Sequence, residues 1–180
     1  MIERRSDSLS RFMTSYARLA RLPPPRFASV EVEGWVKRVV ALEKRLEVRV
    51  APGPGVHIEA DADQLDQLLI NLVRNAADAA LETRGGVTVS WTAGAAELEV
   101  SVADEGPGIA DTANLFVPFF TTKPQGTGIG LALSRQIAEL HHGALVLENR
   151  SDRTGARARL RLPIKRSESP ALGSEGAPQC

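Results

Sequence analysis

Residues 61–86, DADQLDQLLINLVRNAADAALETRGG, hold the strongest secondary-structure signal of the 180-residue chain. Apolar residues recur there at steps of three and four, the spacing of one helix face. They are Leu65, Leu68, Leu69, Leu72, Val73 and Ala76. We expect Asp61 to cap this helix, with Gln64 at the reciprocal capping position, and Gly85-Gly86 to end it. The stretch therefore predicts a long helix that is buried along one side.

A polar stripe lies beside the leucines of the same helix. Asn71, Asn75 and Asp78 are spaced by four and three residues, so they share one face. Two amides and a carboxylate offer oxygen ligands to a hard cation such as Mg²⁺, which takes its other ligands from water and phosphate. A solvated polar face would show the same pattern, so the stripe alone leaves both interpretations open.

Short strands and helices are expected on both sides of this helix. Upstream, the patterns predict a leader helix at 2–21 that ends before three prolines, strands at 28–33, 47–50 and 56–59, and a helix at 34–46 with Trp35, Val36, Val39, Val40 and Leu42 inward. Downstream, they predict a hairpin of 87–91 and 98–103, a helix at 131–142, and strands at 144–148 and 156–163. Residues 165–180, rich in Ser, Pro and Gly, are expected to be a disordered tail.

The segment 104–127 is predicted to be a long loop with two glycine motifs at its ends. In Asp104-Glu-Gly-Pro-Gly-Ile109, the aspartate can accept a hydrogen bond from an exocyclic amine, and the glycines let a flat ring approach. Gly126-Thr-Gly-Ile-Gly-Leu131 opens the next helix and offers its amides and positive end to an anion. The second motif is not a Walker loop, since no Gly-Lys-Ser/Thr follows, and Leu131 excludes the dinucleotide fingerprint.

Between the glycine motifs lies Leu115-Phe-Val-Pro-Phe-Phe-Thr-Thr-Lys123. Its phenylalanines can anchor the loop as a lid, while Thr121, Thr122 and Lys123 can reach a polyphosphate. A surface loop with a small hydrophobic cluster is the alternative for this segment taken alone.

Charge and cysteine content exclude several classes of protein. The 22 basic and 22 acidic side chains balance, so no overall field favours nucleic acid. The single cysteine, Cys180, excludes an intramolecular disulfide and a cysteine-based zinc site. The sequence shows no signal peptide and no apolar run of about 20 residues. We therefore expect a cytoplasmic chain without membrane contact, although its parent protein could be membrane-anchored.

Together these motifs resemble the catalytic and ATP-binding domain of sensor histidine kinases, in the superfamily that includes gyrase, Hsp90 and MutL. Asn71-Leu-Val-Arg-Asn75-Ala matches the N box, and Asp104-Glu-Gly-Pro-Gly108 matches the first glycine box. Phe116-Val-Pro-Phe-Phe120 matches the F box, and Gly126 to Leu131 matches the second glycine box. The leader is similar to the end of the dimerisation hairpin of nitrogen-regulation sensor kinases.

The resemblance implies an α+β fold, a two-layer α/β sandwich (the Bergerat ATP-binding fold) with a mixed, mostly antiparallel sheet backed by helices. It also implies three parts. Residues 1–25 would be the second helix of a truncated dimerisation hairpin, residues 26–164 the catalytic ATP-binding domain, and residues 165–180 the tail.

The resemblance further implies roles for single residues. Asp104 would bind the adenine amino group, Asn75 would coordinate Mg²⁺ with help from Asn71, and Lys123 would neutralise phosphate charge. Asn71, Asn75 and Lys123 would be the catalytic residues. The implied ATP-binding residues are Asn71, Asn75, Asp78, Asp104, Gly106, Gly108, Ile109, Phe116, Phe120, Thr121, Thr122, Lys123, Gly126, Thr127, Gly128, Ile129, Gly130 and Leu131.

The implied activity is transfer of the ATP γ-phosphate to a histidine of the dimerisation hairpin, for relay to a response-regulator aspartate. Hydrolytic members of the superfamily carry a glutamate as general base at position 71, and the amide of Asn71 cannot accept that proton.

We expect structural or solvated roles for His57, His141 and His142, which places the acceptor histidine upstream of Met1. Residues 2–21 could then form a homodimer. The alternatives are a catalytically silent, nucleotide-gated binding module and a serine kinase of the anti-sigma type.

Overall fold

The structure, a computed structural model, describes residues 22–110, 114–121, 123 and 126–164. The expected leader helix at 2–21 and tail at 165–180 lie outside this range. The described elements are, in chain order, β1 (Ala28–Glu31), α2 (Val32–Val40), β2 (Val48–Val50), β3 (His57–Ala60), α3 (Ala62–Thr83), β4 (Val87–Ala93), β5 (Glu97–Asp104), α4 (Gly130–Leu140), β6 (Ala144–Asn149) and β7 (Ala156–Pro163).

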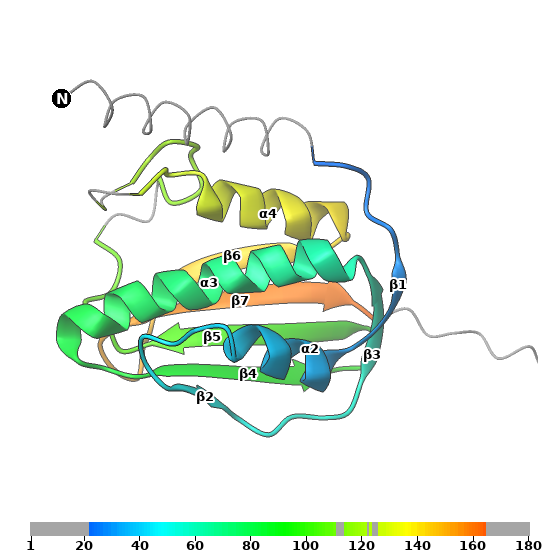
Figure 1. Cartoon of the computed structure of the whole chain (residues 1–180), viewed down its shortest axis with the longest axis horizontal. Helices are drawn as coiled ribbons and strands as arrows, with labels where there is room; N and C mark the ends of the chain where they lie inside the picture. The colour runs from blue at the N-terminus through cyan, green and yellow to red at the C-terminus, as the bar shows by residue number, and fades with distance from the viewer. Residues whose placement is uncertain (1–21, 111–113, 122, 124–125, 165–180) are drawn as a thin grey trace, which may run out of the picture.

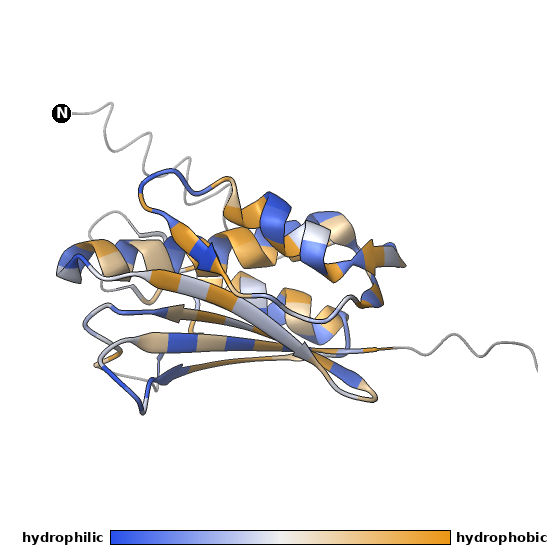
Figure 2. Ribbon diagram, turned by 90° about the horizontal axis from the view of Figure 1, so that it is seen from below, coloured by the Kyte–Doolittle hydropathy of each residue, from blue (hydrophilic) through white to orange (hydrophobic). Residues whose placement is uncertain are grey.

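Five of the strands form one mixed sheet in the order β2-β4-β5-β7-β6. The β2–β4 pair is parallel and the other three pairs are antiparallel. Strands β1 and β3 form a separate antiparallel pair. Helices α2, α3 and α4 all lie on one face of the five-stranded sheet (Figure 1), and the edge-on view separates a helix layer from a strand layer (Figure 2). The predicted two-layer sandwich with a mostly antiparallel sheet is confirmed.

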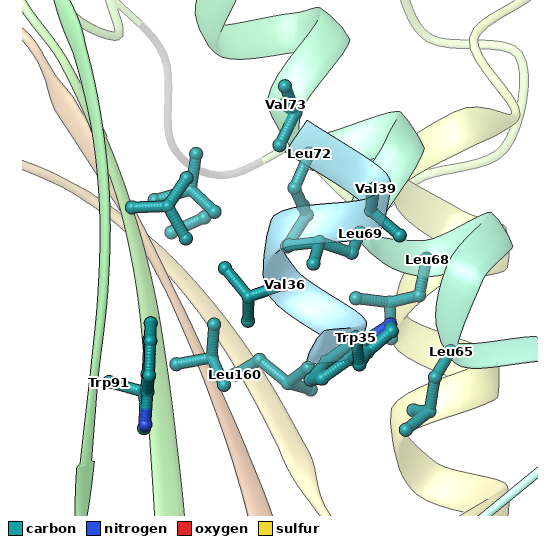
Figure 3. Close-up of a cluster of buried hydrophobic side chains, with 14 of the residues drawn as sticks. Trp35, Val36, Val39, Leu65, Leu68, Leu69, Leu72, Val73, Trp91 and Leu160 are labelled. Atoms are coloured by element: carbon teal, nitrogen blue, oxygen red, sulfur yellow. The ribbon is translucent and has the colours of Figure 1, made fainter. Parts of the chain in front are cut away.

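The core lies between the two layers. Strands β4, β5 and β7 alternate buried and partly exposed residues, so every second side chain points at the helices. The predicted stripe of α3 from Leu65 to Ala76 is buried throughout. Figure 3 shows these leucines against Trp35 of α2, with Trp91 and Leu160 on the strands opposite. Because each large apolar side chain stabilises the fold by about 1.5–3 kcal/mol when buried, this interface fixes α3 on the sheet.

Helix α2 differs from its predicted bounds at both ends. It begins at Val32 because the Glu31 carboxylate accepts hydrogen bonds from the amides of Glu33 and Gly34, at 2.9 and 2.6 Å. It ends at Val40, well before residue 46. Leu42 therefore lies in the turn beyond the helix with 60% of its surface exposed, and its predicted inward position is wrong.

The start of α3 confirms one half of the predicted capping pair. An Asp61 carboxylate oxygen accepts a hydrogen bond from the Gln64 amide at 3.1 Å. The reciprocal half is wrong, because the Gln64 side chain is buried and donates to the Pro23 carbonyl at 2.9 Å. The Asp61 amide instead donates to Nε2 of His141 at 3.0 Å. The beginning of α3 is thus tied to the segment before β1 and to the end of α4.

A search for membrane-spanning helices over the described ranges finds none, since no helix there combines sufficient length with sufficient apolar character.

Candidate functional site

Asp104, the last residue of β5, presents a buried carboxylate. It is 6% exposed, and its Oδ1 accepts hydrogen bonds from the amides of Gly106 at 2.8 Å and Ala156 at 3.1 Å. Within the described part of the chain, Oδ2 has no hydrogen-bond partner. The carboxylate is therefore held by one oxygen and can accept a donor from a ligand with the other.

The two glycines after Asp104 are required by close contacts. A Cβ added at Gly106 would lie 2.6 Å from Cβ of Ala79, so this loop lies directly on α3. Gly108 has a φ of +83°, a conformation that favours glycine, and a Cβ there would lie 2.8 Å from Oδ1 of Asn149. The family resemblance implies that these glycines lie in a nucleotide pocket, and the structure shows that they let the loop pack closely between α3 and β6.

The polar stripe of α3 meets the loop at Lys123. Its Nζ lies 2.6 Å from Oδ2 of Asp78 and 3.4 Å from Oδ1 of Asn75. The other oxygen of Asp78 accepts from Arg45 at 2.5 Å, and Arg45 also binds both carboxylate oxygens of Glu43. The stripe is therefore part of an ion-pair network, not a simply solvated face.

Two carboxylates of this network are held ionised. For Asp78, burial favours the neutral form, but hydrogen bonds and charges from Lys123 and Arg45 outweigh it, so the pKa is lowered. Hydrogen bonding to Arg45 lowers the pKa of Glu43 to about 2, although its side chain is only 4% exposed. Both acids consequently carry a negative charge at neutral pH.

Asn71 is directed toward the start of α4. Its Nδ2 donates to Oγ of Ser134 at 2.9 Å, and a Cβ added at Gly130 would collide with its Oδ1. Asn75 contacts Lys123 instead. The structure thus brings Asn71 together with the second glycine box and Asn75 together with the lid lysine.

Besides the contacts of Lys123, the lid is fastened at two further described points. The amide of Phe119, a residue with a φ of 70°, donates to the Gly128 carbonyl at 2.9 Å. Phe116 packs against the core, with the guanidinium carbon of Arg135 lying 5.2 Å from its ring centroid. Phe120 is 40% exposed, and Thr121 accepts a hydrogen bond from the Lys123 amide at 3.1 Å. Thr122 lies outside the described residues.

The predicted motifs contact α3 one after another, and the later a motif lies in the chain, the nearer its contact lies to the start of the helix. The first glycine box touches Ala79, Lys123 of the lid touches Asp78 and Asn75, and Gly130 of the second glycine box touches Asn71. Eight residues separate Asn71 from Ala79, which corresponds to about 12 Å along a helix. The site is therefore an elongated surface along α3, with a carboxylate at one end and glycine amides at the other.

Several site residues escaped the sequence analysis. Arg45 lies in the loop between α2 and β2, Ser134 on α4, and Asn149 and Arg150 at the end of β6. None belongs to a motif or a periodic pattern, so only the fold brings them to the site. A hollow of about 980 Å³ lies against β2, β4, β5 and β7, and Arg150 lies at its border, but none of the predicted site residues lines it.

The fold and this site define a domain that can hold an elongated anionic ligand with a flat donor group at one end. Comparison with known proteins identifies the family. Residues 60–166 match the family of histidine kinase-, DNA gyrase B- and HSP90-like ATPases. The chain belongs to this family.

Two curated relatives are sensor proteins. The chain is 38% identical over 137 residues to the C4-dicarboxylate transport sensor protein DctS of Rhodobacter capsulatus, covering 73% of this chain and 20% of DctS. It is 36% identical over 140 residues to the sensory histidine kinase/phosphatase NtrB of Azospirillum brasilense, covering 67% of this chain and 35% of NtrB. The chain therefore spans a minor part of these relatives.

Two solved structures share the fold. The catalytic domain of histidine kinase ThkA matches with a TM-score of 0.67 and 31% identity, covering 77% of this chain and 95% of that domain. Full-length ShkA in complex with AMPPNP matches with a TM-score of 0.75 and 30% identity, covering 89% of this chain and 36% of ShkA. The part of the chain that matches ThkA is a histidine kinase catalytic domain.

Proposed function

We propose that this chain binds Mg-ATP along α3 and transfers the γ-phosphate to a histidine on a dimerisation hairpin of the same parent protein. The observation that carries the proposal is the order of contacts on α3, where Gly106, two residues after Asp104, lies beside Ala79 and Gly130 of the second glycine box lies beside Asn71. A nucleoside triphosphate laid along this surface meets a carboxylate at its base and backbone amides at its phosphates. In this proposal residues 26–164 form the catalytic domain.

The hydrogen-bonding groups at the adenine end determine which base the site accepts. Oδ2 of Asp104, which has no hydrogen-bond partner among the described residues, is an acceptor and suits the exocyclic amine of adenine. Guanine presents a carbonyl oxygen at the corresponding position, and two acceptors would then face each other. We therefore expect the site to prefer ATP to GTP.

As far as the structure describes it, the phosphate end combines the Lys123 ammonium group with the backbone amides at the start of α4. Helix α4 begins after Ile129, and no side chain of the described residues caps it, so its first amides can bind an anion. Lys123 lies on the lid side, where its ammonium group can move from Asp78 to a phosphate oxygen. The segment from Gly126 to Leu131 then holds the phosphate chain, and Lys123 offsets its charge.

The donor set fits a magnesium ion that arrives with the nucleotide. Over the described ranges, no group of three or more His, Cys, Asp or Glu could hold a metal ion alone. Asn75 offers an amide oxygen, and Mg²⁺ commonly combines few protein ligands with water and substrate phosphates. When bound, the ion would neutralise phosphate charge next to Asn75.

The residue at position 71 favours transfer over hydrolysis. Its amide does not accept a proton from water, and its Nδ2 is engaged by Ser134. The domain can therefore position ATP for an incoming ring nitrogen of histidine, which forms the P–N bond as the bond to the β-phosphate oxygen breaks and ADP leaves. A response-regulator aspartate would take the phosphate next, and residues 2–21 would contribute to a homodimer in the cytoplasm.

The test uses the full 180-residue chain and a separately produced hairpin from the parent protein, mixed with ATP labelled at the γ-phosphate. We expect acid-labile, base-stable label on the hairpin histidine. We expect the chain alone to bind ATP without becoming labelled. Stable histidine labelling of this chain by itself, or failure of the chain to bind ATP, would contradict the proposal. Removal of Mg²⁺ with EDTA should abolish transfer.

A further inference from the structure

The turn between β6 and β7, residues 149–156, packs against the segment from Asp104 to Ile109. Gly155 has a φ of +130°, and a Cβ there would collide with the Asp104 carbonyl oxygen. The Arg150 amide donates to the Gly155 carbonyl at 3.0 Å, which closes the turn. The amide of Ala156, at the far side of the turn, is one of the two donors to the Asp104 carboxylate. The turn is thus in direct contact with the adenine end of the proposed site.

Asn149 binds Ile109, the last residue of this segment. Its Oδ1 accepts from the Ile109 amide at 2.7 Å, and its Nδ2 donates to the Ile109 carbonyl at 2.9 Å. One side-chain amide therefore pairs with both backbone groups of one residue, as a neighbouring strand would. Gly108 leaves the space for this contact, because a Cβ at that position would press on the same Oδ1.

Arg150 binds Asp104, the first residue of the segment. Its Nη1 donates to the Asp104 carbonyl at 3.1 Å, and its side chain is only 10% exposed. Asp152 binds the rest of the guanidinium group, with 2.7 Å to Nη2, and this hydrogen bond raises the pKa of Arg150. Two consecutive residues thus fix the two ends of one loop, Asn149 by a neutral amide and Arg150 by a partly buried cation.

We infer that Asn149 and Arg150 are positioning residues for the adenine pocket, because together they fix Asp104 and Ile109 relative to the turn between β6 and β7. The inference rests on the proposed function, since it requires an adenine nucleotide beside Asp104. Neither side chain contacts the base. Asn149 acts through the backbone of Ile109, and Arg150 acts through the backbone of Asp104.

Asn149→Ala in the full chain is the decisive variant. The side chain is exposed, so its truncation removes two hydrogen bonds and leaves the core intact. We expect about tenfold weaker binding of ATP, in line with the loss of two exposed hydrogen bonds. ADP should weaken by the same factor, since the change lies at the adenine end, and the preference for ATP over GTP should fall.

Two further variants sharpen the test. Asn149→Asp keeps an acceptor for the Ile109 amide but loses the donor to the Ile109 carbonyl, so an intermediate loss is expected. Val146→Ala truncates another exposed side chain of β6, whose register partner is Arg159, and should leave nucleotide affinity unchanged.

The outcomes separate the inference from the proposed function. Unchanged ATP affinity and ATP/GTP preference in Asn149→Ala would overturn the inference, even if the variant melts at a lower temperature, because its role would then be only structural. Weaker binding with unchanged thermal stability would support it. If the unaltered chain fails to bind ATP or fails to prefer it to GTP, the proposed function itself is overturned.

Discussion

The backbone amide of Asp61 donates a hydrogen bond to Nε2 of His141, 3.0 Å away and 80 positions later in the chain. Nδ1 of the same ring lies 2.8 Å from the Ile137 carbonyl, so Nδ1 carries the proton and Nε2 is the acceptor. The ring is 2% exposed. This histidine therefore joins the start of α3, which carries Asn71 and Asn75, to the end of α4.

The segment that enters the domain is fixed at the same place. Oδ2 of Asp61 accepts from the Arg26 amide at 2.8 Å, and the ring of Phe27 lies edge-on to His141, with 5.4 Å between centroids. Helix α4 begins at Gly130 of the second glycine box. A displacement of the entering segment would thus act on both helices that line the site.

Replacing His141 tests how much its contact with Asp61 contributes to the free energy of unfolding. His141→Ala removes a buried ring and two hydrogen bonds, so we expect it to lower the free energy of unfolding by about 2–4 kcal/mol. His57→Gln changes a histidine that is exposed on β3 and should stay within about 0.5 kcal/mol of the original chain. Urea denaturation of both variants measures the difference, and equal stabilities would mean that the Asp61–His141 contact contributes little.

Asp104→Asn should separate binding from folding. The amide keeps an oxygen for the amides of Gly106 and Ala156, but it turns an NH₂ donor toward the amine of adenine. We expect ATP affinity to fall about 100-fold, typical of losing a charged hydrogen bond and opposing two donors. Calorimetric titration gives the affinity and thermal denaturation reports the fold. Glu105→Gln removes a charge one position away and should bind ATP nearly as well as the original chain.

The Glu43–Arg45 pair should make the stability of the domain depend on pH in the acid range. The pKa of Glu43 is about 2 in the folded protein, below its ordinary value of 4.5, because Arg45 hydrogen-bonds the carboxylate. Its contribution to stability is therefore complete above pH 4.5 and is lost as the pH falls toward 2. In Arg45→Gln, the free energy of unfolding should depend less steeply on pH over this range. Identical slopes in the two proteins would exclude the pair as a source of acid sensitivity.

Local patterns were sufficient to predict the elements and the motifs. The stripe from Leu65 to Ala76 and the alternation in β4, β5 and β7 depend on burial against one neighbour, and that burial leaves a period in the sequence. The glycine motifs were equally visible, because their close contacts with Ala79 and Asn71 tolerate no Cβ.

The pairings between distant segments could not be predicted in the same way. Arg45 with Asp78, His141 with Asp61 and Asn149 with Ile109 each join two segments far apart in the sequence. A single polar residue in a turn has no period, so nothing local distinguishes it from a solvated one. The prediction that Leu42 points inward was wrong for a related reason, since the apolar spacing continues past the point where α2 ends at Val40.

Gly130 and Asn71 should behave as a coupled pair. A methyl group at Gly130 would collide with Oδ1 of Asn71, so Gly130→Ala should destabilise the fold by about 1–3 kcal/mol and displace the start of α4. Truncating Asn71 to alanine in the same chain removes the obstacle, and the double variant should recover most of the lost stability in a double-mutant cycle. Gly55→Ala is the matched control, because a Cβ there meets nothing within 4 Å. If the double variant is no more stable than Gly130→Ala alone, the glycine is required by something other than its contact with Asn71.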